Sequence, residues 1–138
     1  MADPEAGQAT IDLDWREGDT TVRWTYDRQR VAISFEEPPV SVVAWHDPPC
    51  VIVVEPFGEP TGRWDGRKRN AIVYNADGSE RVRLIPPERF ARSFHPVGFY
   101  AVYRDRSGLV AVVTIPGADF WGRPNLDTGE LTNVSEWR

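Results

Sequence analysis

The sequence predicts an all-β, mainly antiparallel fold, and three observations lead to this prediction. Apolar and polar residues alternate with a period of two in several short segments. Turn-forming residues separate these segments about every ten positions. Two turns, at residues 75–78 and 105–108, end in Gly and have the chemistry of tight hairpins. We therefore expect a sandwich, or a curved and partly closed sheet built from hairpins, with at most one short helix.

The first hairpin is predicted over residues 21–35, with residues 27–30 as its turn. Alternation places six apolar side chains on one face of this hairpin: Val22, Trp24, Tyr26, Val31, Ile33 and Phe35. Arg23 falls on the opposite face, between Thr21 and Thr25. Pro38 and Pro39 end the pairing, because proline has no backbone N–H to donate.

A central strand is predicted from the apolar run at residues 51–54. It follows a strand over residues 40–46, and every side chain of the run is apolar. A strand in which apolar and polar residues alternate has one face exposed to solvent, whereas a continuous apolar run is typical of a strand covered on both faces. The next segment, residues 56–70, is rich in Gly and Pro and reads as a long loop.

The second half of the chain predicts two more hairpins. Their strands are residues 71–74 with 81–85, and residues 98–104 with 109–115. Residues 88–93 are the best candidate for a short helix, since Pro86 and Pro87 precede them and Glu88 suits a helix start, and a loop is the alternative. We expect residues 131–134 to form a last short strand. Residues 120–124 fit no regular period, so we interpret Phe120 and Trp121 as a core plug or an exposed anchor. In the whole chain we expect eight or nine strands.

Length and composition favour one domain. The chain has 138 residues, and residues 1–10 read as a flexible tail before a single β domain over residues 11–138. Cys50 is the only cysteine, which excludes an internal disulfide. No apolar run has the length of a membrane span, and residues 1–20 lack the pattern of a secretory signal. We therefore expect a cytoplasmic protein that does not contact a membrane.

The charges are unevenly distributed. The net charge is −5, and residues 1–62 hold twelve acidic and four basic residues, a net of −8. We expect an acidic patch that binds a protein partner, made of Asp12, Asp14, Glu17, Asp19, Glu36 and Glu37. Overall acidity argues against nucleic-acid binding, which favours a basic domain.

An alternative partner-binding site lies in the basic segment that follows. Residues 63–92 carry a net charge of +4, with eight basic and four acidic residues. Arginine beside an aromatic ring can stack on a partner's side chain, a sugar or a base. The candidate residues are Trp64, Arg67, Lys68 and Arg69.

Reactive side chains are few, so we expect neither catalysis nor a cofactor. His46 and Cys50 are close in sequence, but Pro48 and Pro49 separate them and Cys50 opens an apolar strand. Two histidines and one cysteine include no pair with zinc-type spacing, and no phosphate-binding glycine motif is present. We expect no metal site.

Residues 70–81, NAIVYNADGSER, combine a buried strand with an Asn-Ala-Asp-Gly turn in a small acidic chain. In hairpin style, size and acidity, this chain resembles the small acidic immunity proteins with which bacteria neutralise toxins. The resemblance covers about half of the chain and transfers no family residue. It implies a one-to-one complex that blocks a toxin, with the acidic half of this chain meeting a basic cleft.

Two other functions stay open. A β domain rich in Trp can bind a carbohydrate or another small molecule, provided that several Trp side chains share one open groove. A small β-barrel enzyme would use His46, Cys50 or His95. Of these functions, the charge pattern most favours a protein-binding domain.

Overall fold

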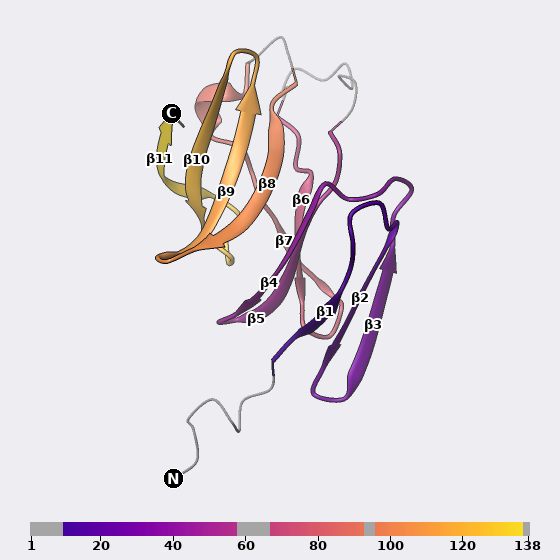
Figure 1. The fold of residues 1–138 in the computed structure, drawn as a ribbon. Helices are drawn as coiled ribbons and strands as arrows, with labels where there is room; N and C mark the ends of the chain where they lie inside the picture. The colour runs from indigo at the N-terminus through magenta and orange to yellow at the C-terminus, as the bar shows by residue number, and fades with distance from the viewer. Residues whose placement is uncertain (1–9, 58–66, 93–95, 137–138) are drawn as a thin grey trace.

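The protein consists of three antiparallel sheets packed side by side, as a computed structural model shows (Figure 1). The structure describes residues 10–57, 67–92 and 96–136. Most of the predicted tail, residues 1–9, lies outside the described residues. The all-β prediction is confirmed, and no sheet in the described part of the chain closes on itself.

The strands divide into sheets in chain order. The N-terminal sheet has the order β1-β2-β3, with β1 (Asp12–Asp14), β2 (Thr21–Tyr26) and β3 (Gln29–Ser34). The central sheet has the order β4-β5-β6-β7, with β4 (Ser41–His46), β5 (Pro49–Val54), β6 (Ala71–Asn75) and β7 (Glu80–Arg83). The C-terminal sheet has the order β11-β10-β9-β8, with β8 (Gly98–Asp105), β9 (Gly108–Ile115), β10 (Ala118–Pro124) and β11 (Leu131–Glu136).

Three expectations need correction. The described residues form eleven strands rather than eight or nine. The segment at residues 120–124 does have regular structure: it is part of β10, whose pairing with β11 shifts register between Trp121 and Arg123, and Phe120 and Trp121 are both partly exposed. That bulge interrupts the alternation on which the prediction relied. The predicted helix at residues 88–93 is a single 3₁₀ turn, Glu88–Phe90, and residue 93 lies outside the described residues.

The central strand β5 is buried on both faces, as its apolar run predicts. Cys50, Ile52 and Val54 belong to a core between the central and C-terminal sheets, together with Phe99 and Val113. Val51 and Val53 belong to a second core, between the central and N-terminal sheets. Successive side chains of a strand point to opposite faces, so one apolar strand serves both cores.

The buried amide of Asn70 joins the central sheet to β8. Its Nδ2 donates to the carbonyl oxygens of Glu55 at 2.6 Å and Phe99 at 2.8 Å, and its Oδ1 accepts from the Phe99 N–H at 2.8 Å. The side chain therefore satisfies backbone groups beside the register shift of β8 at Phe99. A buried polar side chain is tolerated where its bonds are complete, as they are here.

The N-terminal sheet is attached to the central sheet by Trp24. The indole is 2% exposed, and its Nε1 donates to the Ala76 carbonyl in the β6–β7 turn at 2.9 Å. Tyr74 packs against it with a ring-centroid distance of 6.2 Å. Gly78 lies so close to Val31 that a Cβ there would be 2.7 Å from the valine side chain. The sheets therefore meet where a larger residue would push them apart.

We expect Asn70→Ala to destabilise the fold by about 3 kcal/mol, because it leaves the Phe99 N–H and two carbonyls without partners in a dry site. Urea denaturation gives the free energy of unfolding. Asn75→Ala is the matched control, since it removes an amide at the other end of β6, which Asn70 immediately precedes, and the bonds of Asn75 to Ser79 and Arg81 lie near the surface. The control should lose about 1 kcal/mol. Equal losses in the two variants would contradict a structural role for Asn70.

We expect Arg28→Gly to stabilise the fold by about 1 kcal/mol. The β2–β3 turn has two residues in the left-handed region, Asp27 with φ 47° and Arg28 with φ 68°, and a residue with a Cβ is strained there. Arg30→Gly is the control, because Arg30 lies within β3, where Gly weakens a strand. The melting temperature should rise for Arg28→Gly and fall for Arg30→Gly. A fall for both variants would contradict the backbone strain that we infer at Arg28.

Candidate functional site

The residues of the predicted acidic patch divide between two parts of the N-terminal sheet. Glu17 and Asp19 lie in the β1–β2 connection, and Glu36 and Glu37 follow β3. The Phe35 N–H donates to the Thr20 carbonyl at 2.8 Å, which brings these two segments together at one end of the sheet. We call these four residues, all exposed, the acidic end.

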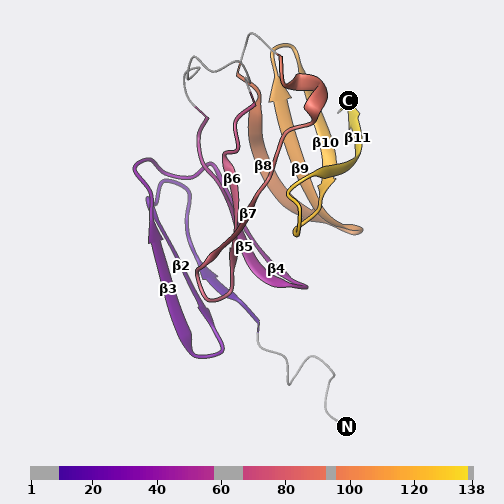
Figure 2. The ribbon, with the colours of Figure 1, turned by 180° about the vertical axis from the view of Figure 1, so that it is seen from behind.

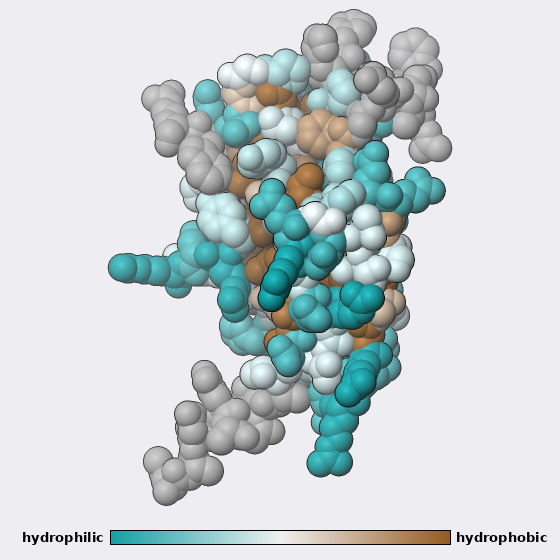
Figure 3. Space-filling model, turned by 45° about the vertical axis from the view of Figure 1, so that its right-hand side comes forward, coloured by the Kyte–Doolittle hydropathy of each residue, from teal (hydrophilic) through white to brown (hydrophobic). Residues whose placement is uncertain are grey.

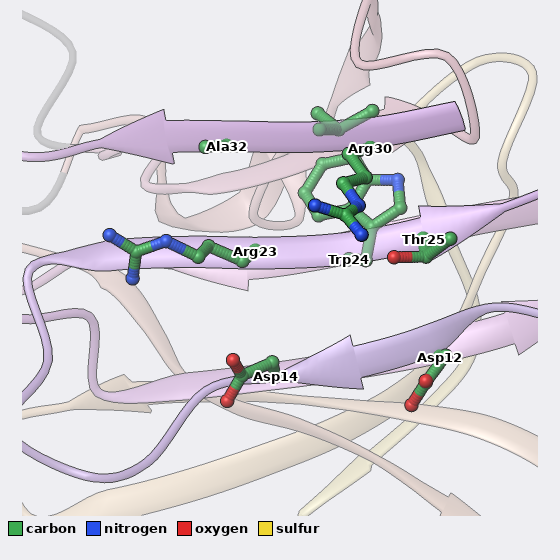
Figure 4. A pocket seen from close by; sticks show the side chains of 8 residues that line it. Asp12, Asp14, Arg23, Trp24, Thr25, Arg30 and Ala32 are labelled. Atoms are coloured by element: carbon green, nitrogen blue, oxygen red, sulfur yellow. The ribbon is translucent and has the colours of Figure 1, made fainter. Parts of the chain in front are cut away.

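Asp12 and Asp14 lie instead on the outer surface of the N-terminal sheet, the side turned away from the central sheet. Their strand β1 pairs with β2, which places Asp12 opposite Thr25 and Asp14 opposite Arg23. The next strand places Arg30 beside Thr25 and Ala32 beside Arg23. The surface thus has two cross-strand rows, Asp12–Thr25–Arg30 and Asp14–Arg23–Ala32. We call these six residues the charged face (Figure 4).

The charged face surrounds a shallow hollow. Its volume is about 500 Å³, and the six residues of the face line it together with Trp24 and Val31. Ala32 leaves room between the longer side chains of its neighbours, because cross-strand neighbours stand about 5 Å apart. Figure 3, which brings this side of the molecule forward, shows mainly hydrophilic residues with smaller apolar areas between them.

The four charges of the charged face have no partner of their own among the described residues. None of Asp12, Asp14, Arg23 and Arg30 forms a side-chain hydrogen bond or ion pair there. Some other arginines of the chain are paired: Arg123 binds both carboxylate oxygens of Asp105, at 2.9 and 3.0 Å. That contact lowers the pKa of the Asp105 carboxyl below its usual value. The charged face therefore keeps its charges available for another molecule.

The alternative basic segment is held in place over its described part. Trp64 lies outside the described residues. Arg67 pairs with Val97, and its Nη1 lies 3.3 Å from the Pro86 carbonyl. The Lys68 N–H donates to Val97, and the Arg69 carbonyl accepts from Arg83. The last residues of the predicted loop are thus fixed against their neighbours.

The candidate catalytic pair is divided between surface and core. His46 is exposed, and its ring contacts that of Trp45 in a tilted arrangement with a centroid distance of 4.4 Å. Cys50 is fully buried, as the sequence predicts. Burial raises the pKa of the Cys50 thiol to about 11, against a smaller opposing effect of Arg81. The reactive thiolate is therefore scarce at neutral pH, and His95 lies outside the described residues.

A second hollow lies at the opposite end from the acidic end, where the hairpin turns gather. It has a volume of about 460 Å³ and lies beside Trp45, Pro48, Leu109 and Arg123. Trp45 is fixed by a 2.8 Å bond from its Nε1 to the Asp47 carbonyl. Trp24, by contrast, borders the hollow of the charged face and is nearly buried. Trp24 and Trp45 thus do not share one open groove, which is the arrangement that a carbohydrate site would need.

Sequence reasoning missed Arg23 and Arg30 as candidate residues. The alternation of residues 21–26 already placed Arg23 on the polar face of its strand. The alternation did not reveal that β1 pairs with β2, and this pairing brings Asp14 beside Arg23. We expected the surface around Asp12 and Asp14 to be acidic, but it carries both negative and positive side chains.

Among the residues that the structure describes, no group of three or more His, Cys, Asp or Glu side chains is placed to hold a metal ion. No helix in the same residues has the length and apolar character needed to cross a membrane.

We expect the stability of the protein to fall between pH 9 and pH 11 partly because of Cys50. The folded thiol has a pKa near 11 against an ordinary value of 9.0, so the unfolded chain releases its proton first as the pH rises. The thiol's stabilising effect is complete below pH 9 and is lost toward pH 11. Urea denaturation at both pH values should show a smaller loss in Cys50→Ala than in the unmodified protein. Identical losses would contradict this expectation.

No protein-family model, curated protein or solved structure matches this chain.

Proposed function

We propose that this chain is a protein-binding domain whose partner docks on the charged face of the N-terminal sheet. The observation that carries the proposal is the set of four ionised side chains without partners among the described residues, arranged in cross-strand rows around a hollow. An unpaired charge costs little free energy while it is exposed to water. When another protein docks, the same charges favour a partner whose charges form the opposite pattern.

The pattern of the charged face defines the partner's chemistry. The carboxylates lie on β1 and the guanidinium groups on β2 and β3, so the face is negative along one side and positive along the other. A matching partner presents Lys or Arg over β1 and Asp or Glu over β2 and β3. Nucleic acid carries one sign of charge only and would meet Asp12 and Asp14 unfavourably.

The partner that we propose is a toxin that the chain inhibits in a one-to-one complex in the cytoplasm. Support comes from the resemblance to immunity proteins and from the acidic end, which lies next to the charged face. A basic cleft on the toxin would be steered toward Glu17, Asp19, Glu36 and Glu37, and the charged face would then fix the orientation. Inhibition follows if the bound domain covers the toxin's active site.

The test exchanges the signs of the charged face without changing the net charge. The variant combines Asp12→Lys, Asp14→Lys, Arg23→Glu and Arg30→Glu. The control, Asp119→Lys with Arg104→Glu, also exchanges signs, at exposed positions on the C-terminal sheet. Each tagged protein captures partners from lysate of the source cells, and mass spectrometry identifies them. Calorimetry with the purified partner then gives the dissociation constant.

We expect the control to bind like the unmodified protein and the exchanged face to bind at least about tenfold more weakly. Circular dichroism verifies that both variants are folded. A partner that binds the exchanged face with unchanged affinity would refute the charged face as the docking site. Co-expression with the partner tests inhibition: a toxin should halt growth alone and lose this effect with the unmodified protein.

A further inference from the structure

Within the described part of the chain, the outer edge of β3 is open over its whole length. β3 pairs with β2 through six consecutive residue pairs without a register shift. β3 is the last strand of its sheet, and no described strand pairs with its other side. Figures 1 and 2 show it at the margin of the molecule from both directions. An open edge exposes unpaired backbone groups that can accept another strand.

The other edges in the described part of the chain are each interrupted or covered. β1 has only three residues, and two of them are Asp12 and Asp14. β7 has four residues, and the Ile85 N–H beyond it donates to Gly129. β8 contains a register shift, and β11 contains Asn133 with φ 54°. These features are among the usual means by which proteins prevent edge pairing. β3 differs from the other edges because it has six residues, its register with β2 is uninterrupted and its only charged residue is Arg30.

The edges of β4 and β8 cover one another. The Ser41 hydroxyl donates to the Val102 carbonyl at 3.0 Å and lies 3.3 Å from the Val102 nitrogen. One hydroxyl thus serves backbone groups of the neighbouring edge. Of the six edges that the described sheets possess, β3 alone has neither a bulge, a covering segment nor a very short length.

The pairing of β2 with β3 determines which backbone groups point outward. Two residues, Asp27 and Arg28, connect the strands, so Tyr26 and Gln29 form the first hydrogen-bonded pair. Such pairs recur at every second residue, and the bond from Phe35 to Thr20 continues the series at the far end. The N–H and C=O groups of Arg30, Ala32 and Ser34 therefore point away from β2.

We propose that β3 pairs antiparallel with β3 of a second copy of this chain, centred on Ala32. In this register Ala32 faces Ala32, Arg30 faces Ser34 and Val31 faces Ile33. All three outward-pointing residues of each copy are then matched with outward-pointing residues of the other. The two N-terminal sheets become one six-stranded sheet, and this inference stands independently of the proposed function.

Side-chain chemistry also favours this register. Val31 and Ile33 are partly exposed and pack against the core between the N-terminal and central sheets. The second copy would cover their remaining surface and extend that core across the interface. Arg30 lies opposite Ser34, a neutral residue whose Oγ lies 3.0 Å from the Oγ1 of Thr21, whereas a register centred on Arg30 would bring two guanidinium groups together. The pairing covers a narrow strip, so we expect a dimer that dissociates upon dilution.

The first test is sedimentation of the full chain at a series of concentrations. We expect the mass to rise from that of one chain, 15.7 kDa, toward that of two. Ala32→Pro should stay at the mass of one chain at every concentration. Proline removes the outward N–H of Ala32 but leaves the ladder with β2 intact, and such edge positions tolerate it. Circular dichroism verifies that this variant is folded.

The second test uses disulfide cross-linking and does not depend on the proline variant. Ala32→Cys places two thiols opposite one another in a hydrogen-bonded pair, where Cα atoms about 5.5 Å apart allow a disulfide. Thr25→Cys is the control, because Thr25 lies on the same face but on the middle strand, away from the interface. Cys50 is buried in both proteins.

Mild oxidation should link Ala32→Cys into a dimer at least about tenfold faster than Thr25→Cys. Equal rates in the two variants, or the mass of one chain at all concentrations of the unmodified protein, would overturn the proposal. Neither measurement involves a partner, so the result is separate from that of the exchanged charged face. If the chain stays monomeric but Ala32→Pro loses a captured protein, the edge belongs to that partner and self-pairing is wrong.

Discussion

The burial of β5 on both faces is the constraint on which the arrangement of the three sheets depends. Val51 and Val53 face one core while Cys50, Ile52 and Val54 face the other, so neither outer sheet can be removed without exposing this strand to water. Burial of apolar area is the main driving force available to such a chain. A central sheet with two apolar faces therefore requires two covering sheets, and the hairpins on either side of it in sequence supply them.

Polar contacts then determine where each covering sheet lies. Asn70 binds Glu55 and Phe99, which holds the edge of the C-terminal sheet at the end of β5. The Trp24 indole binds Ala76, which holds the N-terminal sheet at the opposite turn. Apolar packing alone permits sheets to slide, whereas a buried hydrogen bond has one position in which it is satisfied. These two side chains thus give directional contacts to a structure driven by nondirectional burial.

Both proposed interfaces lie on the N-terminal sheet. Its inner side contributes Val22 and Trp24 to the core, and its outer side presents the charged face. The proposed partner uses that outer side, and the proposed second copy uses the free edge of β3. A dimer would place two charged faces next to one another in one sheet, related by the axis through Ala32. The two proposals share Arg30, which belongs to the charged face and lies opposite Ser34 of the second copy in the proposed dimer, whereas Asp12, Asp14 and Arg23 lie on the strands away from the β3 edge.

The sequence by itself determined the all-β class, most strand positions, the inward sides of the first hairpin and the double burial of β5, because these follow from local periodicity and turn chemistry. It did not reveal β10, because the bulge between Trp121 and Arg123 breaks the alternation, nor the two-residue turn at Asp27 and Arg28, which lacks the usual Gly. Tertiary structure alone decided the partners of Asn70, which lie 15 and 29 residues away. It also decided the composition of the charged face. Asp12 and Asp14 were candidates because of their negative charge. The pairing of β1 with β2 and of β2 with β3 places Arg23 and Arg30 beside them, and this register depends on the turns that join the strands and on the face that is buried, not on the alternation within one strand alone.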